Sequence, residues 1–250
     1  MYTDTEGIIL KHIRAVNGRK MVLLFSKKLG KISAAGSYEK SKSKVALALR
    51  PFTHGRYNLF KGRDVYNINS AEVIKAYYGI GEDVEKYMCA SFVLELTERL
   101  LPENAQSPEM FKLVLDFFDL IELRKKKHMT LLMAYQLKAI QCMGFAPEIG
   151  RCVCCGNKEK LEFFDVKEGG MICADCRNNI TRHELIYTMD FDIINALCYF
   201  LGNNLKSVEH IALDDKILER LKDIVKEYRI YHLSIMELKS EEVLNNYNGG

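Results

Sequence analysis

Two pairs of cysteines constrain this chain more than any other feature. The pairs are Cys152-x-x-Cys155 and Cys173-x-x-Cys176, and seventeen residues separate them. This spacing is typical of a structural zinc site in which each pair forms a turn that presents two thiolates. Gly156 follows the first pair, where such a turn needs a residue that tolerates positive φ. We therefore predict that the four cysteines bind one zinc ion with Zn–S distances of about 2.3 Å.

The segment between the pairs predicts a short hairpin, with apolar strands at residues 161–166 and 169–172. A module of this size cannot fold without help, so the metal would stabilise it. Four thiolates leave no open position for water, which favours a structural over a catalytic metal. Free or redox-active thiols are the alternative. A disulfide framework is disfavoured because the chain lacks a secretory signal and is long enough for its own core.

The other four cysteines are expected to stay outside the zinc site. Cys154 lies inside the first pair, but adjacent cysteines point apart and do not readily form a disulfide. Cys89, Cys142 and Cys198 lie in apolar helical patterns, so we predict buried side chains there. No uncharged apolar run of 18 residues and no basic leader is present, which predicts a cytoplasmic protein without a membrane partner.

Positive charge is concentrated in the first third of the chain. Residues 1–80 contain 15 Lys and Arg against 5 Asp and Glu, a net charge of +10. The remaining 170 residues contain 21 against 28, a net charge of −7. This asymmetry indicates a polyanionic partner for the first block alone, and a solvated basic surface without a ligand is the alternative.

The basic block reads as β-structure. Asn17-Gly18 is a strong hairpin signal, and residues 37–44 form a polar, basic stretch that predicts a loop. Five short strands in about 80 residues favour an OB-type β-barrel, with an SH3-like barrel as the alternative that strand count does not separate. The predicted strands are residues 6–16, 19–26, 31–36, 53–61 and 64–73.

From about residue 81 the apolar period changes from 2 to 3.6, which predicts helices. Ser107 is a good N-cap, and Pro108 suits the first helical position. The basic run at residues 124–127 lies between two of these helices and reads as a solvated helix end. The helices are expected at residues 84–101, 108–123, 129–143, 190–201 and 215–236.

The predicted fold class is therefore α+β multidomain. An N-terminal OB-type β-barrel (residues 1–80) is followed by an α-helical domain whose two parts are residues 81–147 and 181–250. A four-cysteine zinc finger (residues 148–180) is inserted between the two parts.

Nucleic-acid binding by such a barrel needs basic loops and aromatic faces. Tyr38, Tyr57, Phe60 and Tyr66 offer rings that either stack on bases or fill the core. Phosphate contacts give affinity without sequence readout, so we expect non-specific, salt-dependent binding. The candidate DNA-binding residues are Lys27, Lys28, Lys31, Lys40, Lys42, Lys44, Arg50, Lys61 and Arg63.

The sequence carries no recognisable catalytic constellation. It has no phosphate-binding G-x-x-x-x-G-K-[ST] loop, no G-x-G-x-x-G, no H-E-x-x-H and no G-x-S-x-G. Its six histidines are scattered along the chain. We expect no catalytic residues and no nucleotide cofactor.

The order of these parts, with a set of short motifs, resembles the RecO family of bacterial recombination mediators over nearly the whole length. The apolar stretch before Cys152 looks like the family's helix before its zinc turn. Relatives carry a Gly-Ala-Arg where this chain has Gly36-Ser37-Tyr38, and Glu39 places an acid on the expected DNA path. The motifs are Gly36 with residues 42–44, then residues 48–52, 60–63, 70–73, 137–147, 231–233 and 238–240.

The resemblance implies a non-enzymatic DNA repair protein of the RecF pathway, present at the nucleoid during repair. It implies binding to single- and double-stranded DNA, annealing of complementary strands and, with RecR, loading of RecA onto DNA coated by single-strand-binding protein. It also implies that the helical domain binds that protein's acidic C-terminal tail. Residues 134–136 (Ala-Tyr-Gln) lack the basic residue that relatives have there, so Lys138 or the run at 124–127 would take over that contact.

Other classes stay open from the sequence. A zinc-ribbon/OB module that binds RNA or acts in transcription is the main alternative, distinguished by contacts to the 2′-hydroxyl group. A metal-dependent enzyme would need an open coordination position. A scaffold whose barrel binds only protein would show no salt-sensitive affinity for nucleic acid.

Overall fold

The computed structural model describes residues 1–14, 20–36, 44–63 and 65–248. The contacts group the chain into two compact units. Unit 1 comprises Met1–Arg124 together with Leu238–Gly250, and unit 2 comprises Lys125–Glu237. The domain limits at residues 80, 147 and 180 stay predictions, because grouping by contacts does not test them.

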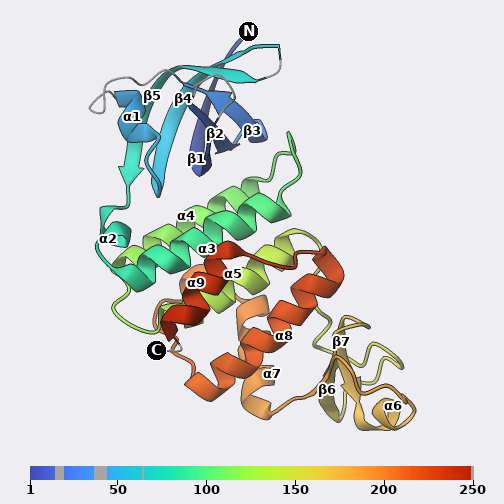
Figure 1. The fold of residues 1–250 in the computed structure, drawn as a ribbon. Coiled ribbons are helices and arrows are strands. Elements are labelled where there is room, and N and C mark those ends of the chain that lie inside the picture. The colour runs from blue at the N-terminus through green and yellow to red at the C-terminus, as the bar shows by residue number, and fades with distance from the viewer. Residues whose placement is uncertain (15–19, 37–43, 64, 249–250) are drawn as a thin grey trace. The chain divides into compact units, whose positions relative to one another are not determined.

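Unit 1 begins with a closed five-stranded barrel in the order β1-β2-β3-β5-β4 (Figure 1). Neighbouring strands are antiparallel except β3 and β5, which run parallel, and β1 also pairs with β4 and so closes the sheet. A short helix, α1 (Lys44–Ala48), connects β3 to β4. This arrangement confirms the OB-type barrel. The strands are β1 (Tyr2–Arg14), β2 (Lys20–Ser26), β3 (Gly30–Ala35), β4 (Thr53–Lys61) and β5 (Tyr66–Ala76).

Apolar and polar residues alternate along the strands, and successive residues of a strand point to opposite faces. The apolar side chains therefore fill the inside of the barrel. Tyr57 is fully buried, and its hydroxyl donates to the Ala48 carbonyl at 2.6 Å, which fixes α1 to the barrel. The core of the barrel comprises Ile9, Val22, Leu24, Ile32, Ala34, Ala48, Leu49, Tyr57, Leu59, Ile68 and Ala71.

The rest of unit 1 is helical. Asp83 caps α3 through its side chain, which accepts from the Lys86 N–H. Ser107 occupies the N-cap position of α4 as predicted, but its side chain makes no capping hydrogen bond. The last helix packs on α3, where the Glu95 carboxylate accepts from the Lys239 and Ser240 N–H groups. The helices are α2 (Tyr78–Gly81), α3 (Val84–Leu100), α4 (Pro108–Leu123) and α9 (Lys239–Asn248).

Unit 2 combines helices with a small sheet in the order β7-β6-β8. Helix α5 packs on α7 and α8, and Asp214 caps α8 by accepting from the Lys216 N–H. Among the residues described, no helix is long and apolar enough to cross a membrane. The elements are α5 (His128–Cys142), β6 (Leu161–Asp165), β7 (Gly170–Cys173), α6 (Ala174–Asn178), β8 (Ile186–Thr188), α7 (Phe191–Gly202), a 3-10 helix η1 (Leu205–Val208) and α8 (Asp215–Leu233).

The elements agree with the sequence where a pattern is long and regular. Strand β4 has the predicted limits, and α4 matches residues 108–123. The sequence missed α1, α2, α6, η1 and β8, which are too short to show a period, and it did not predict the limits of α9. The prediction of a buried side chain is correct for Cys89, whereas Cys142 is only half-buried. It is wrong for Cys198, which is exposed because it lies on the solvent side of α7.

Candidate metal centre and nucleic-acid interface

The four cysteines of the two pairs come together at one point. The sulfur atoms of Cys152, Cys155, Cys173 and Cys176 all lie within 4.8 Å of one another. The Cys155 and Cys173 sulfurs are 3.7 Å apart, and a tetrahedron with Zn–S bonds of about 2.3 Å has sulfur separations of about 3.8 Å. The cluster can hold one metal ion, and its all-thiolate donor set fits zinc.

Local backbone geometry presents these sulfurs. The first pair lies in a turn in which the Gly156 N–H donates to the Cys152 carbonyl at 2.8 Å. Gly156 has a φ of +77°, which the sequence anticipated at this position. Cys173 ends β7, and Cys176 lies three residues further on α6. The hairpin and the short helix therefore carry the second pair to the first.

The electrostatics of the cluster favour a bound cation. Burial disfavours the Cys152 thiolate, but backbone N–H groups of Cys173, Cys155 and Cys154 outweigh it and lower the pKa of Cys152 to about 6. Hydrogen bonds with the neighbouring thiols of Cys155 and Cys173 raise the pKa of Cys176. Thiolates this close repel one another, so a divalent ion is needed to keep all four ionised.

A buried aspartate fixes the turn of the β6–β7 hairpin. Asp165 is fully buried, and its Oδ1 accepts from the Lys167 and Glu168 N–H groups at 3.0 and 3.3 Å. Its Oδ2 pairs with the Arg182 guanidinium at 2.6 Å. This pair joins the hairpin to the segment that leads into β8. The sequence analysis missed it, although an aspartate before a turn is a recognisable signal.

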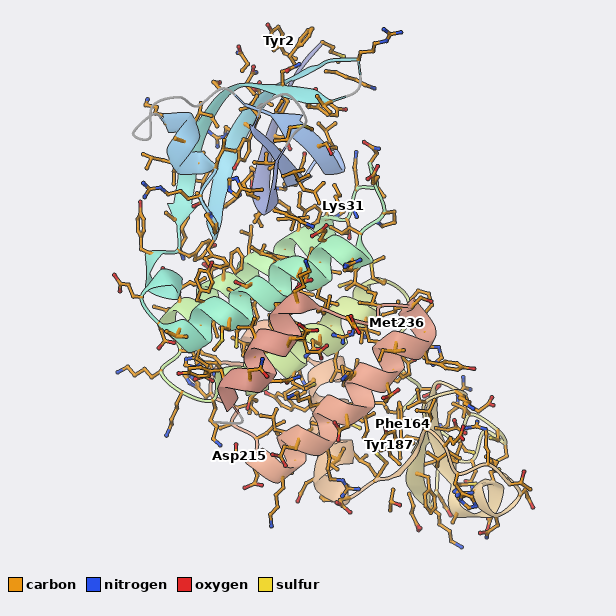
Figure 2. The ribbon with its side chains drawn as sticks, viewed as in Figure 1. Tyr2, Lys31, Phe164, Tyr187, Asp215 and Met236 are labelled. Carbon is orange, nitrogen blue, oxygen red and sulfur yellow. The ribbon has the colours of Figure 1, made fainter. Side chains whose placement is uncertain are left out.

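Helix α8 supports the same hairpin within unit 2. The Phe164 ring lies 5.9 Å from the Tyr228 ring, and the His232 Nε2 donates to the Val166 carbonyl at 2.6 Å. Figure 2 shows Phe164 and Tyr187 on neighbouring strands of this sheet, where their residues pair in register. We call residues 148–188, from the turn before Cys152 to the end of β8, the four-cysteine module.

The predicted DNA-binding residues separate into groups on the barrel. Lys27 and Lys28 are exposed in the β2–β3 turn, where Lys27 pairs with Glu6 at 3.3 Å. Lys31 is half-buried, and its Nζ donates to the Glu98 carbonyl of α3 at 2.7 Å, so its ammonium group is already hydrogen-bonded. Lys40 and Lys42 lie outside the described residues.

The remaining basic candidates are exposed. Lys44 begins α1 and Arg50 follows it, whereas Lys61 and Arg63 lie at the β4–β5 turn. Residue Tyr66, at the start of β5, pairs with Ala34, so the β4–β5 turn lies at the far end of β3 from the β2–β3 turn. The strand register therefore puts these two basic turns about 17 Å apart.

The aromatic candidates are also divided. Tyr57 cannot stack on a base, because its ring is fully inside the barrel. Tyr66 packs against the same core, and Tyr38 lies outside the described residues. Phe60 is 40% exposed on the outer face of β4. Sequence reasoning missed its neighbour Tyr2, which is 61% exposed, because the two residues meet only through the pairing of β1 with β4.

The basic candidates on the helices are engaged in contacts of their own. Lys138 donates to the Leu201 carbonyl at 2.7 Å, and Lys127 pairs with Asp215 at 2.7 Å. Tyr135 and Gln136 are buried in unit 2 and present no surface for a partner.

A closed OB-type barrel with basic turns, a helical region and a four-thiolate centre defines the class: multidomain OB-barrel proteins with a four-cysteine module. Comparison with known proteins gives the family. The model of the Recombination protein O N-terminal domain matches residues 1–77, and that of the Recombination protein O C-terminal domain matches residues 81–242.

Curated relatives agree over almost the full length. DNA repair protein RecO of Thermoanaerobacter sp. (strain X514) is 30% identical over 97% of this chain and 96% of its own. DNA repair protein RecO of Alkaliphilus metalliredigens is 29% identical over 97% of this chain and 98% of its own. The chain belongs to the RecO family, and its role is in DNA repair and recombination.

Proposed function

We propose that this protein is a non-enzymatic mediator of homologous recombination in the RecF pathway. It binds single- and double-stranded DNA, anneals complementary strands and, with RecR, assists RecA loading onto DNA coated by single-strand-binding protein. It acts in the cytoplasm, at the nucleoid. The observation that supports this most is a closed OB-type barrel that carries exposed basic residues at its turns, in a chain of the RecO family.

The proposed annealing activity needs no nucleotide cofactor such as ATP. The basic residues of the barrel screen phosphate repulsion between two strands, and base pairing supplies the free energy. The exposed candidates at this surface are Lys27, Lys28, Lys44, Arg50, Lys61 and Arg63.

We assign the four-cysteine module a structural zinc ion. Cys152, Cys155, Cys173 and Cys176 would hold it, and four thiolates leave no position at which water or substrate could be activated. The ion would supply folding free energy to the module and take no part in a reaction.

The acidic tail of single-strand-binding protein has a candidate site in unit 1. A cleft of about 450 Å³ lies between β1 and α3, with Phe52 and Leu94 among its apolar lining and Lys11, Arg99 and Lys239 among its charged lining. Its two carboxylates are already engaged, since Glu95 accepts from the start of α9 and Glu98 pairs with Lys11. An Arg99→Glu change should weaken binding of an acidic peptide without altering DNA affinity.

The deciding experiment is annealing of complementary oligonucleotides without nucleotide, with and without single-strand-binding protein. We expect faster annealing than the spontaneous rate, including on coated strands. Preference for RNA over DNA of the same sequence would instead favour the RNA-binding alternative. Absence of any salt-sensitive DNA binding would exclude the mediator function.

A further inference from the structure

The face that OB barrels commonly use for oligonucleotides is partly covered in this protein. Ligands of these barrels bind across strands 2 and 3. Here Phe25, on the outer face of β2, is fully buried and packs edge-on against Phe111 of α4 at 5.3 Å. His54 of β4, which is separated from β2 by β1, contacts the same ring at 5.8 Å, and Lys31 of β3 is hydrogen-bonded to α3. Bases that stack on this barrel are therefore restricted to its uncovered surface.

An exposed aromatic pair exists elsewhere on the barrel. Tyr2 of β1 and Phe60 of β4 are direct cross-strand neighbours, with ring centroids 5.2 Å apart and planes inclined at 51°. They are 61% and 40% exposed, whereas Tyr57 and Leu59 on the inner face of β4 are fully buried. Figure 2 shows Tyr2 at the opposite end of the barrel from Lys31. Two large rings left in water on a folded barrel are available for stacking.

Charge next to this pair is positive on one side. Lys61 and Arg63 are exposed at the β4–β5 turn that immediately follows Phe60, and neither forms an ion pair with a described residue. On the other side, the next outward residue of β1 is Asp4, whose carboxylate accepts from Asn58 at 2.7 Å. The phosphates next to a base stacked on these rings would therefore be attracted by Lys61 and Arg63 at the turn and repelled by Asp4 along β1.

We propose that the Tyr2–Phe60 pair is a stacking platform for unpaired bases of single-stranded DNA, with Lys61 and Arg63 contacting the adjacent phosphates. The inference rests on the proposed function, because it specifies which part of the barrel touches the strand. Bases of an intact duplex are already stacked on one another, so this platform selects single strands. Every base has a π-face, so it is tolerant of sequence.

A tryptophan reporter tests the contact directly. The chain contains no tryptophan, so the Tyr2→Trp variant carries a single one at the platform. Titration with an oligothymidylate should quench its fluorescence in step with binding, followed separately by anisotropy of a labelled oligonucleotide. The matched control is Tyr78→Trp, since Tyr78 is 65% exposed at the start of α2. Binding without quenching at position 2, or equal quenching in both variants, would overturn the proposal.

Measurements of DNA affinity at several salt concentrations distinguish stacking of the rings on bases from contacts between basic side chains and phosphates. The Tyr2→Ala/Phe60→Ala variant should bind about 5- to 150-fold more weakly for one stacked base, with an unchanged slope of log K against log salt. The Lys61→Ala/Arg63→Ala variant should instead lower the slope by about 1.4, or 0.7 for each lost phosphate contact. Phe60→Tyr keeps the ring and should retain affinity. All four side chains are exposed, and circular dichroism checks the fold of each variant.

The outcomes distinguish this inference from the proposed function. If the parent protein binds no single strand, the proposed function fails. If the parent binds and the aromatic double variant binds equally well, the platform is wrong, including the case in which these rings dock a protein instead.

Discussion

The barrel and the four-cysteine module are both small β-structures, but they are stabilised in different ways. The described part of the barrel buries a continuous core of eleven side chains inside a closed sheet. The core around the four cysteines has three buried residues, Cys152, Ile172 and Cys173, and two of them are candidate metal ligands. A closed sheet has no free edges and supports itself, whereas the end of the module that carries the cysteines has little apolar core besides the candidate ligands themselves.

DNA binding and the stability of the four-cysteine module therefore depend on different parts of this chain. The candidate DNA contacts lie on the element that folds through apolar burial. The proposed zinc ion would stabilise a different element, to which we assign no chemistry.

Removal of the metal should unfold the four-cysteine module and leave the barrel folded. Structural zinc contributes an apparent binding free energy of about 10–16 kcal/mol in isolated zinc modules. Cys173→Ser, or a chelator, should therefore remove hydrogen-exchange protection from residues 148–188 but not from β1–β5, and annealing should survive in part. Cys154→Ser is the matched control, because Cys154 is exposed and outside the four-sulfur cluster. Freshly purified, reduced protein without zinc would refute the site.

A cavity in the core of the barrel should destabilise the barrel and leave the four-cysteine module folded. Leu24 is fully buried in the core, so Leu24→Ala should cost about 2–5 kcal/mol of unfolding free energy. Denaturant titration measures the loss, and the zinc content should remain at one ion per chain. Phe60→Ala removes a larger but exposed side chain and should cost much less. Loss of zinc in Leu24→Ala would show that the two elements are coupled.

Loss of the buried ion pair should weaken the four-cysteine module alone. Asp165→Asn keeps an oxygen for the hairpin turn but removes the charged partner of Arg182, and hydrogen bonds to charged groups contribute about 1.5–3 kcal/mol. Arg182 is 27% exposed, so we expect the lower end of that range. Glu168→Gln is the control, since that carboxylate is 56% exposed at 3.4 Å and should contribute less than about 1 kcal/mol. Equal effects on local hydrogen exchange would contradict the argument.

Removal of the three positive charges at residues 40, 42 and 44 should alter only DNA binding. The change is Lys40→Ala, Lys42→Ala and Lys44→Ala together, and it should lower the salt slope by up to about 2, at 0.7 for each phosphate contact. Unfolding free energy should be unchanged. An unaltered slope would exclude these three lysines from the DNA path, leaving the exposed basic residues of the β2–β3 and β4–β5 turns and Arg50 as the candidates.

The sequence predicted which cysteines come together better than it predicted which barrel side chains stay exposed, for a physical reason. A zinc turn is local, so the spacing within each cysteine pair nearly fixes its geometry. A binding surface depends on which side chains remain exposed after packing. Lys31 and Tyr57 are of the right residue types, yet one is bonded to α3 and the other is inside the barrel.

Local sequence patterns were enough to predict the alternating strands, the long helices, the concentration of positive charge before residue 80 and the clustering of the four cysteines. Tertiary structure alone decided that β3 lies parallel to β5, that β8 joins β6, and that α4 covers Phe25. It also brought Tyr2 beside Phe60, which is 58 positions away in the chain. Periodicity and turn spacing are set by adjacent residues, whereas these contacts join distant segments whose register is chosen by packing of the whole core.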